Sequence, residues 1–350
     1  MFSHHQLYQE DLVYTSALNI DWQLLEEKKI LITGASGLVG TFLIDVLMYR
    51  IRHHLSNYTI YAAGRNKLKL SERFSEYESF SKNFKIIELD VNKAINSNVN
   101  YDYIVHAASN THPLEYAQDP VGSITTNLWG AYHLLQYGIS HNLKRFIYLS
   151  SVEIYGEALS SDDIFDESYC GYIDCNTVRA GYPESKRVGE SLCQSFAEKY
   201  GIEIVIARLS RLFGSTICPD DSKALSQFLH RAINGEDIIL KSTGTQRYSY
   251  TYIADAVAAL LYIWLHGKNR EAYNIANANE SIMLKDIAEN IAKNVGTKVI
   301  YDIPSKQEQT GFSKVSTAIM DVSKLQQLGW KNRFSLLEGI QRNIKILLKK

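Results

Sequence analysis

A glycine-rich segment near the N-terminus constrains the fold of this chain more than any other feature. The segment TGASGLVG places Gly34, Gly37 and Gly40 directly after an apolar run at 28–34 and directly before a helical pattern at 41–55. In that context the first glycine allows a tight turn, the second lets the backbone approach a pyrophosphate, and the third allows close helix–strand packing. The start of the helix then faces the anion. The segment therefore predicts a dinucleotide-binding unit, although the same glycines can also serve a purely structural turn.

The chain continues with an alternation of strands and helices. Five further apolar runs predict buried strands, at 58–64, 84–90, 101–109, 145–151 and 202–210. Helical patterns between them occur at 66–80, 119–140 and 182–201. Strands that alternate with helices indicate a parallel sheet covered on both faces. We therefore expect an α/β fold, a Rossmann-like doubly wound parallel sheet.

After about residue 211 the pattern becomes irregular, which indicates a smaller lobe. Short helices are expected there at 223–234, 253–267, 284–296 and 335–349. We divide the chain into an N-terminal extension, a dinucleotide-binding domain with one interleaved part, and a smaller C-terminal substrate-binding lobe. The extension is 1–27, the domain is 28–210 with a part near 248–270, and the lobe is 211–247 and 271–350.

The composition excludes several classes of function. The 37 basic and 38 acidic side chains of the 350 residues nearly cancel, so we expect no attraction to nucleic acid or anionic membranes. No uninterrupted apolar run reaches the length of about 18 residues that a membrane helix needs. The N-terminus does not resemble a secretory signal. The four cysteines, Cys170, Cys175, Cys193 and Cys218, form no disulfide or zinc pattern, and we expect reduced thiols in a cytoplasmic protein without a metal.

Two residues bear on which dinucleotide is bound. Asp90, at the end of the third strand, can accept a hydrogen bond from an adenine amino group or serve as a helix N-cap. Arg65 follows the second strand, where NAD enzymes place a carboxylate on the ribose. An arginine there can pair with the 2′-phosphate of NADP, stack on adenine, or lie solvated on the surface. The lack of an acidic residue at this point favours NADP over NAD.

The chemistry is indicated by a Tyr-x-x-x-Lys pattern at the start of a predicted helix. Tyr182 and Lys186 are four positions apart, so both side chains lie on one helical face. An ammonium group, together with the positive charge of an oxidised nicotinamide, is expected to lower the pKa of the tyrosine. Such a phenol can take a proton from an alcohol while hydride leaves the same carbon. The hydroxyl groups of Ser150-Ser151, one strand earlier, can hydrogen-bond the developing carbonyl.

Together these segments resemble the extended short-chain dehydrogenase/reductase family, in its branch of nucleotide-sugar epimerases, dehydratases and decarboxylases. The resemblance covers most of residues 28–345 and includes TGASGLVG, ELDV, HAAS, SSVEIYG, YPESK, ARLSRLFG, YIADAV and LGW. It implies that Ser151, Tyr182 and Lys186 are the catalytic trio, with Asn127 supporting the lysine. It also implies a homodimer, in which the helices at 119–140 and 182–200 pair across a two-fold axis.

The resemblance further implies which residues surround the two ligands. Around NAD or NADP we expect Gly34, Ser36, Gly37, Leu38, Val39, Gly40, Arg65, Asp90, Val91, Ala107, Ala108, Asn127, Tyr182 and Lys186. Around the nucleotide sugar we expect Ser109, Ser151, Arg211, Lys223, Gln227, Arg247 and Tyr248. Arg211 stands where many relatives have asparagine; it can bind a diphosphate or polar sugar, or form a structural salt bridge.

The departures from the family patterns bear on the reaction. The 4,6-dehydratases carry Asp-Glu, and the UDP-glucuronate decarboxylases Ser-Glu, where this chain has Val152-Glu153. Val152 cannot donate a proton, which disfavours dehydration by the usual route. The decarboxylases also have an arginine where gap-free alignment places Tyr248; Arg247 is one position away. The hypothesis that this protein is a decarboxylase is therefore weakened as well.

An epimerase needs only the tyrosine, first as base and then as acid. We therefore expect a redox-neutral epimerase of a nucleotide-linked sugar or sugar alcohol, acting through a transient ketone with tightly bound NAD(P). Glu153 is then a loop-orienting carboxylate or a base next to the ketone. The alternatives are a UDP-glucuronate decarboxylase or 4,6-dehydratase, an NADPH-dependent ketosugar reductase, and, in another class, a non-catalytic dinucleotide sensor.

Overall fold

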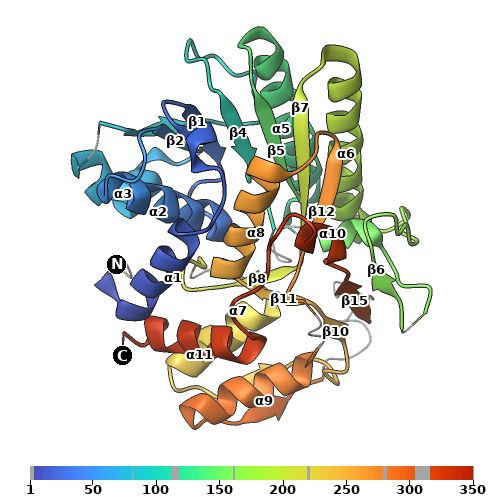
Figure 1. Cartoon of the computed structure of the whole chain (residues 1–350). Helices are drawn as coiled ribbons and strands as arrows, with labels where there is room; N and C mark the ends of the chain where they lie inside the picture. Colours follow the sequence, from blue (N-terminus) through green and yellow to red (C-terminus); the bar gives the residue numbers. More distant parts are fainter. Residues whose placement is uncertain are drawn as a thin grey trace.

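A seven-stranded parallel sheet forms the centre of the molecule (Figure 1). The computed structural model describes residues 4–80, 82–111, 118–160, 162–218, 221–278, 282–303 and 316–349. The strands run in the order β12-β7-β5-β4-β1-β2-β3, and each neighbouring pair is parallel. Their bounds are β1 Lys29–Thr33, β2 Thr59–Gly64, β3 Phe84–Glu88, β4 Tyr103–His106, β5 Arg145–Ser151, β7 Glu203–Leu209 and β12 Glu271–Ile275. The predicted doubly wound parallel sheet is confirmed.

Helices cover both faces of this sheet, as buried strands require. One face packs against α2 (Leu38–Arg52), α3 (Lys67–Phe80) and α8 (Ile253–His266). The other packs against α5 (Pro120–Ser140) and α6 (Gly181–Tyr200), which also contact each other closely (Figure 1). Asp119 caps α5 by accepting a hydrogen bond from the Gly122 N–H at 2.8 Å, and Gly201 ends α6 in the left-handed conformation.

The remaining elements build a smaller lobe at the carboxyl ends of the strands. Its helices are α7 Ala224–Ile233, α9 Leu284–Val295, α10 Ser323–Gln326 and α11 Leu336–Leu347. Its short strands are β6 Ile164–Phe165, β8 Arg211–Phe213, β9 Ile238–Leu240, β10 Arg247–Tyr248, β11 Tyr250–Tyr252, β13 Ile282–Met283, β14 Val299–Tyr301 and β15 Thr317–Met320. The structure differs from our division in three places. Strand β12, which lies within 271–350, pairs with β7 in the main sheet. Strand β6, within 28–210, pairs with β15, and β11, within the part near 248–270, pairs with β8, so both belong to the lobe.

The N-terminal extension contains a helix that the sequence pattern did not predict. Helix α1 (Gln6–Ser16) packs against α2, α8 and α11, and a short 3-10 helix, η2 (Trp22–Leu25), follows it. Its buried face carries polar groups as well as apolar ones: Tyr8 donates a hydrogen bond to Asp45 at 2.5 Å, and Asp11 accepts one from Tyr252 at 2.6 Å. Because this face is partly polar, it gives no clear hydrophobic periodicity.

The described residues contain neither a membrane-spanning helix nor a metal-binding cluster. None of the helices there combines the length and hydropathy that a membrane span requires. Within the same ranges, no group of three or more His, Cys, Asp or Glu side chains is placed to hold a metal ion.

Candidate active site

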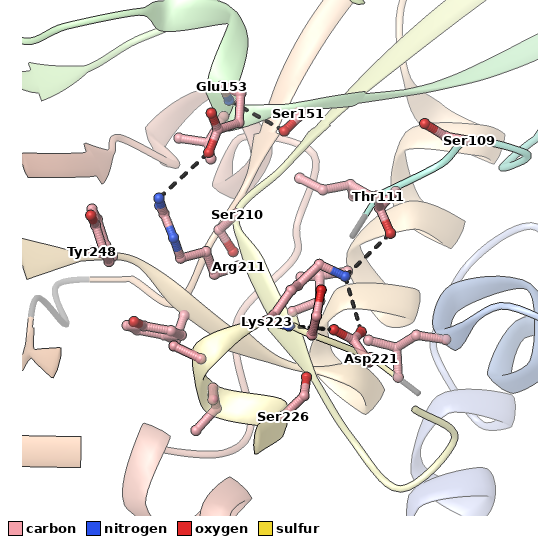
Figure 2. A pocket seen from close by; sticks show the side chains of 18 of the residues that line it. Ser109, Thr111, Ser151, Glu153, Ser210, Arg211, Asp221, Lys223, Ser226 and Tyr248 are labelled. Atoms are coloured by element: carbon pink, nitrogen blue, oxygen red, sulfur yellow. Dashed lines mark hydrogen bonds and ion pairs between the residues drawn. The ribbon is translucent and has the colours of Figure 1, made fainter. Parts of the chain in front are cut away.

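A cavity of about 600 Å³ lies between the carboxyl ends of the sheet strands and the smaller lobe. Its walls include the ends of β1, β4, β5 and β7 from the sheet, and the start of α7 from the lobe. Strands β1 and β4 are neighbours, and the strand order reverses between them. Ligands of doubly wound sheets bind at such a switch point. The cavity is therefore the candidate site, and its polar part is drawn in Figure 2.

The glycine segment forms one wall of the cavity, as predicted. Gly34 has φ +67°, and a Cβ there would lie 2.6 Å from the carbonyl oxygen of Ala107. A Cβ on Gly40 would lie 2.4 Å from the Gly34 oxygen, whereas one on Gly37 has only that oxygen nearby, at 3.3 Å. No side chain caps the start of α2, and its first residues, Leu38 and Val39, line the cavity. This cradle of backbone donors fits the pyrophosphate of a dinucleotide.

The other residues expected around the cofactor lie at or near this wall. Ala107 lines the cavity, and the Ala108 N–H donates to Thr33 Oγ1 at 3.3 Å. Asp90 accepts a hydrogen bond from the Asn92 N–H at 3.1 Å, so its carboxylate organises a turn rather than a helix N-cap. Neither Asp90 nor Ala108 is among the described residues that line the cavity, and the same is true of Asn127, Ser36, Val91 and Arg65. The Ser36 carbonyl accepts from Cys218, Val91 is buried, and Arg65 is exposed after β2.

The structure brings the predicted catalytic trio together. Tyr182 and Lys186, in the first turns of α6, and Ser151, at the end of β5, all line the cavity. Tyr182 is hydrogen-bonded to Ser151 and to Ser109. The Ser151 Oγ also accepts from the Glu153 N–H at 3.2 Å, which fixes its orientation at the start of the 3-10 helix η3 (Val152–Tyr155). A hydroxyl donor and a phenol thus face the same space.

The two titrating groups of this trio are strongly affected by burial. Burial raises the pKa of Tyr182 to about 12, although hydrogen bonds with Ser151 and Ser109 lower it. Burial also lowers the pKa of Lys186 to about 7. We expected a lowered tyrosine pKa, so in the protein alone that expectation fails. The reason is that desolvation dominates, and Nζ of Lys186 donates to the Leu149 carbonyl at 2.9 Å.

Asn127 lies behind the trio and is fully buried. Its side-chain oxygen accepts from the Ser109 hydroxyl at 2.7 Å, and its amide nitrogen donates to Ser185 Oγ at 2.9 Å. The Ser185 hydroxyl in turn donates to the Tyr182 carbonyl at 2.7 Å. The structure therefore connects Asn127 to the first turn of α6 and to Ser109, which lines the cavity.

Glu153 lies between two arginines at the reacting end of the cavity. Its carboxylate accepts from Arg179 at 2.8 Å and lies 3.5 Å from a terminal nitrogen of Arg211. The Arg211 guanidinium is stacked over the Tyr248 ring, 3.4 Å from the ring centre. Figure 2 shows Arg211 reaching toward Glu153 with Tyr248 beside it. Of the two arrangements expected for Arg211, the structure contains the salt bridge and leaves the side chain in the cavity wall.

The predicted substrate residues of the lobe are divided between wall and periphery. Lys223, just before α7, donates to Thr111 at 3.2 Å and pairs with Asp221 at 3.1 Å. Gln227, one turn later, also lines the cavity. Arg247, in β10, is not among the described residues that line it.

Sequence reasoning missed Arg179, which lines the cavity three residues before Tyr182. It lies in the 3-10 helix η4 (Val178–Ala180), and no motif or periodicity of the sequence assigns it a function. Its position directly before the Tyr-x-x-x-Lys pattern was the available signal. Its contact with Glu153 depends on tertiary structure.

Known proteins resemble this chain in both sequence and fold. Residues 30–276 match the model of the NAD dependent epimerase/dehydratase family. UDP-glucuronic acid decarboxylase 6 of Arabidopsis thaliana is 30% identical over 317 residues, which are 89% of this chain and 86% of that protein. Among solved structures, UDP-glucose 4-epimerase from Thermotoga maritima superposes with a TM-score of 0.78 at 22% identity, covering 92% of this chain and 99% of that one. UDP-glucuronic acid 4-epimerase from Bacillus cereus, in complex with UDP-glucuronic acid and NAD, gives 0.76 at 22% identity, with the same coverages.

Proposed function

Because this chain belongs to the NAD-dependent epimerase/dehydratase family, we propose that it is a redox-neutral epimerase of nucleotide-linked sugars that acts through a transient keto sugar. One observation carries the choice among the family's reactions. Tyr182 lines the cavity beside Ser151, whereas the two residues that follow Ser151 offer no free acid–base group for dehydration or decarboxylation. The adjacent Val152 is a hydrocarbon, and Glu153 is paired with two arginines.

The residues of the site supply what such a reaction needs. Bound NAD supplies a hydride acceptor and donor at the sugar carbon. Ser151 donates a hydrogen bond to the reacting oxygen, and Tyr182 takes the hydroxyl proton and later returns it to the same oxygen. With NAD bound, the ketone would turn over in the cavity, and hydride would return to the opposite face of the carbon. One hydride and one proton would leave and return, so the product would have the mass of the substrate.

The groups around Tyr182 act on its pKa in both directions. Burial, the largest effect, and the Glu153 carboxylate raise the pKa, whereas the hydrogen bonds with Ser151 and Ser109 and the Arg179 guanidinium lower it. The positive charge of an oxidised nicotinamide also lowers it.

A second reaction is favoured by a separate observation. The curated relatives include UDP-glucuronic acid decarboxylases, three of them 30% identical over most of the chain, and this chain keeps a glutamate at 153. Oxidation of the sugar followed by loss of carbon dioxide is therefore the alternative. Against it stand Val152 in place of serine and the commitment of Glu153 to Arg179 and Arg211.

For the cofactor, we propose a preference for NADP within this NAD-dependent family. Arg65 follows β2 with its side chain exposed, and the turn that it shares with Asn66 carries no carboxylate. A guanidinium at that place can form a charge-assisted pair with a 2′-phosphate.

We also propose a homodimer through the outer faces of α5 and α6. These faces expose apolar side chains: Val121 is 68% exposed, Ile124 39% and Val188 47%. They surround a second hollow of about 410 Å³ between the two helices. Sedimentation is expected to show a dimer for the wild type and a folded monomer for Val188→Asp; a wild-type monomer would overturn the proposal.

Four free thiols, two of them exposed, support a reducing compartment such as the cytoplasm.

The test of the reaction is a panel of nucleotide sugars followed by proton NMR and mass spectrometry, without added cofactor. We expect a new stereoisomer of unchanged mass, and we expect Tyr182→Phe to abolish its formation while the cofactor stays bound. A product lighter by carbon dioxide or by water would replace the epimerase with the decarboxylase or a dehydratase. In a separate reaction with NADPH added, its stoichiometric consumption would indicate a reductase, and an intact cellular role of the Tyr182→Phe variant would indicate a sensor.

A further inference from the structure

We propose that Asp11, in the N-terminal helix α1, is a positioning residue for the cavity. It holds the strand pair β8–β11, which forms part of the cavity wall, in place from behind, and thereby determines how tightly the nucleotide sugar binds. Helix α1 lies outside residues 30–276, which match the family model, so the family's pattern assigns it no function. The inference rests on the proposed function only for the class of ligand in the cavity.

Helix α1 is anchored to the sheet domain near both of its ends. Near its start, Tyr8 donates a hydrogen bond to Asp45 of α2 at 2.5 Å. At its end, the Arg50 guanidinium of α2 donates to the Ser16 carbonyl at 2.5 Å. The first residues of α2 line the cavity at the glycine segment. The position of α1 is therefore fixed relative to the part of the cavity that fits the dinucleotide.

Between these two anchors, Asp11 contacts the lobe. Helix α1 lies between α2 and α11 (Figure 1), and Asp11 is fully buried. One carboxylate oxygen accepts from the Tyr252 hydroxyl at 2.6 Å, and the other accepts from two nitrogens of Arg342 at 2.8 and 3.0 Å. Tyr252 ends β11, and Arg342 belongs to α11. A shift of either element relative to α1 would therefore break hydrogen bonds to a buried charge.

The ring of Tyr252 connects this attachment to the cavity wall. Tyr252 is opposite Phe213 in the pairing of β11 with β8, and their ring centres are 5.6 Å apart. Helix α11 packs on the same two residues: a Cβ on Gly339 would lie 3.0 Å from the Tyr252 Cβ and 3.1 Å from the Phe213 ring. On the same two strands, Arg211 and Tyr250 are opposite each other and line the cavity. The attachment is thus two residues along each strand from side chains of the cavity wall.

A buried charge at this place indicates positioning rather than stability alone. Apolar residues of similar volume stabilise a core about as well as a buried ion pair does. Hydrogen bonds, in contrast, depend on distance and direction, and a buried donor that loses its acceptor is costly. Asp11 therefore selects one position of β11 and α11 relative to the sheet domain. A ligand that touches both lobe and sheet depends on that position, whereas a dinucleotide on the glycine segment does not.

The experiment first measures ligand binding in two variants of the intact chain. Asp11→Asn keeps the side-chain volume and removes the charge, and Tyr252→Phe removes only the hydroxyl that donates to Asp11. Calorimetry titrates UDP and, separately, dTDP into protein that holds NAD. We expect the nucleotide that the wild type binds to lose at least fivefold in affinity in both variants. The affinity for NAD, titrated into protein freed of cofactor, should stay within twofold of the wild type.

Hydrogen exchange provides a second readout, which needs no ligand. Amide exchange in β8 and β11 should become at least tenfold faster in Asp11→Asn, whereas exchange in β4, the middle strand of the sheet, should stay as in the wild type. Gly296→Ala is the matched control. Its φ of +78° strains any side chain, and no atom lies near its Cβ, so it lowers the stability of the lobe without contacting α1. It should leave the affinity for the nucleotide unchanged.

Three results would overturn the inference. The first is unchanged exchange in β8 and β11, or an equal acceleration in β4, since Asp11 would then hold no wall or only add stability. The second is an equal loss of affinity for NAD and for the nucleotide. The third is a loss of nucleotide affinity in Gly296→Ala as large as in Asp11→Asn. If Asp11→Asn does not fold, the same measurements on Tyr252→Phe decide.

These outcomes are distinguishable from a failure of the proposed function. A product lighter by carbon dioxide would overturn the epimerase and leave the positioning role of Asp11 intact. A wild type that binds neither nucleotide would count against the proposed class of substrate, and the exchange measurement alone would then decide the inference.

Discussion

Alanine at residue 40 tests whether the glycine segment positions the cofactor through close packing. A Cβ there would lie 2.4 Å from the Gly34 oxygen and 2.9 Å from the Ala35 Cα, both backbone atoms, whereas ordinary contacts begin at 3.4 Å. The start of α2 must therefore shift by about 1 Å, an overpacking that costs about 1–3 kcal/mol. The helix regains up to about 1 kcal/mol because alanine replaces glycine. We expect a net loss of about 1–2 kcal/mol in the free energy of unfolding.

The same shift moves the N–H groups that face the pyrophosphate. We expect the affinity of Gly40→Ala for the dinucleotide to fall at least tenfold, about 1.4 kcal/mol. The assay is calorimetric titration of NAD into protein freed of cofactor, combined with urea unfolding of the same preparations.

Two other glycines provide matched controls. Gly37 has φ −79°, and a Cβ there meets only the Gly34 oxygen, at 3.3 Å, so Gly37→Ala should fold normally yet lose affinity because its methyl occupies the space of the pyrophosphate. Gly296, with φ +78° and no atom near its Cβ, should lose stability as alanine but bind NAD normally. Wild-type affinity in both Gly37→Ala and Gly40→Ala would refute the assignment of this segment to the pyrophosphate.

Three further changes test individual side chains. Burial lowers the pKa of Lys186 from 10.5 to about 7, so the unfolded chain binds more protons than the folded one between these pH values. The stability of the wild type relative to Lys186→Met should therefore rise with pH across this window, by at most about 1.4 kcal/mol per pH unit. Unfolding titrations that show a stability difference independent of pH would contradict the burial of this charge. Arg65→Ala should weaken NADP about tenfold more than NAD in calorimetry, since one charge-assisted bond to phosphate is lost; unchanged NADP affinity would remove the cofactor preference. Glu153→Gln should reduce the turnover number less than about tenfold, measured as initial rates. Loss of a general base reduces the rate by a factor of about 10²–10⁴, so a reduction of that size would make Glu153 a catalytic base.

The parts of the site that belong to local segments were predictable from the sequence. Gly34, Gly37 and Gly40 follow a strand and begin a helix, and the spacing of Tyr182 and Lys186 places them on one helical face, as the structure has them. Strand ends that meet at one edge of a parallel sheet then bring these segments together.

Features that depend on contacts between distant segments were not predictable. The cluster of Arg179, Glu153 and Arg211 joins three loops or strand ends, and the stacking of Arg211 on Tyr248 joins β8 to β10. Helix α1 escaped prediction because its stability comes from buried polar contacts such as Tyr8 with Asp45. The pKa of a buried phenol depends on its desolvation, which a sequence pattern does not describe.

The central claim is that hydride leaves and returns to one carbon of the sugar while Tyr182 holds the proton of its oxygen. The most direct measurement uses a nucleotide sugar with deuterium at the reacting carbon, incubated with the protein and analysed by NMR and mass spectrometry. We predict that the epimer retains the deuterium at the inverted carbon and has the mass of the starting material. Deuterium lost to solvent, or a product that has lost carbon dioxide or water, would contradict the account.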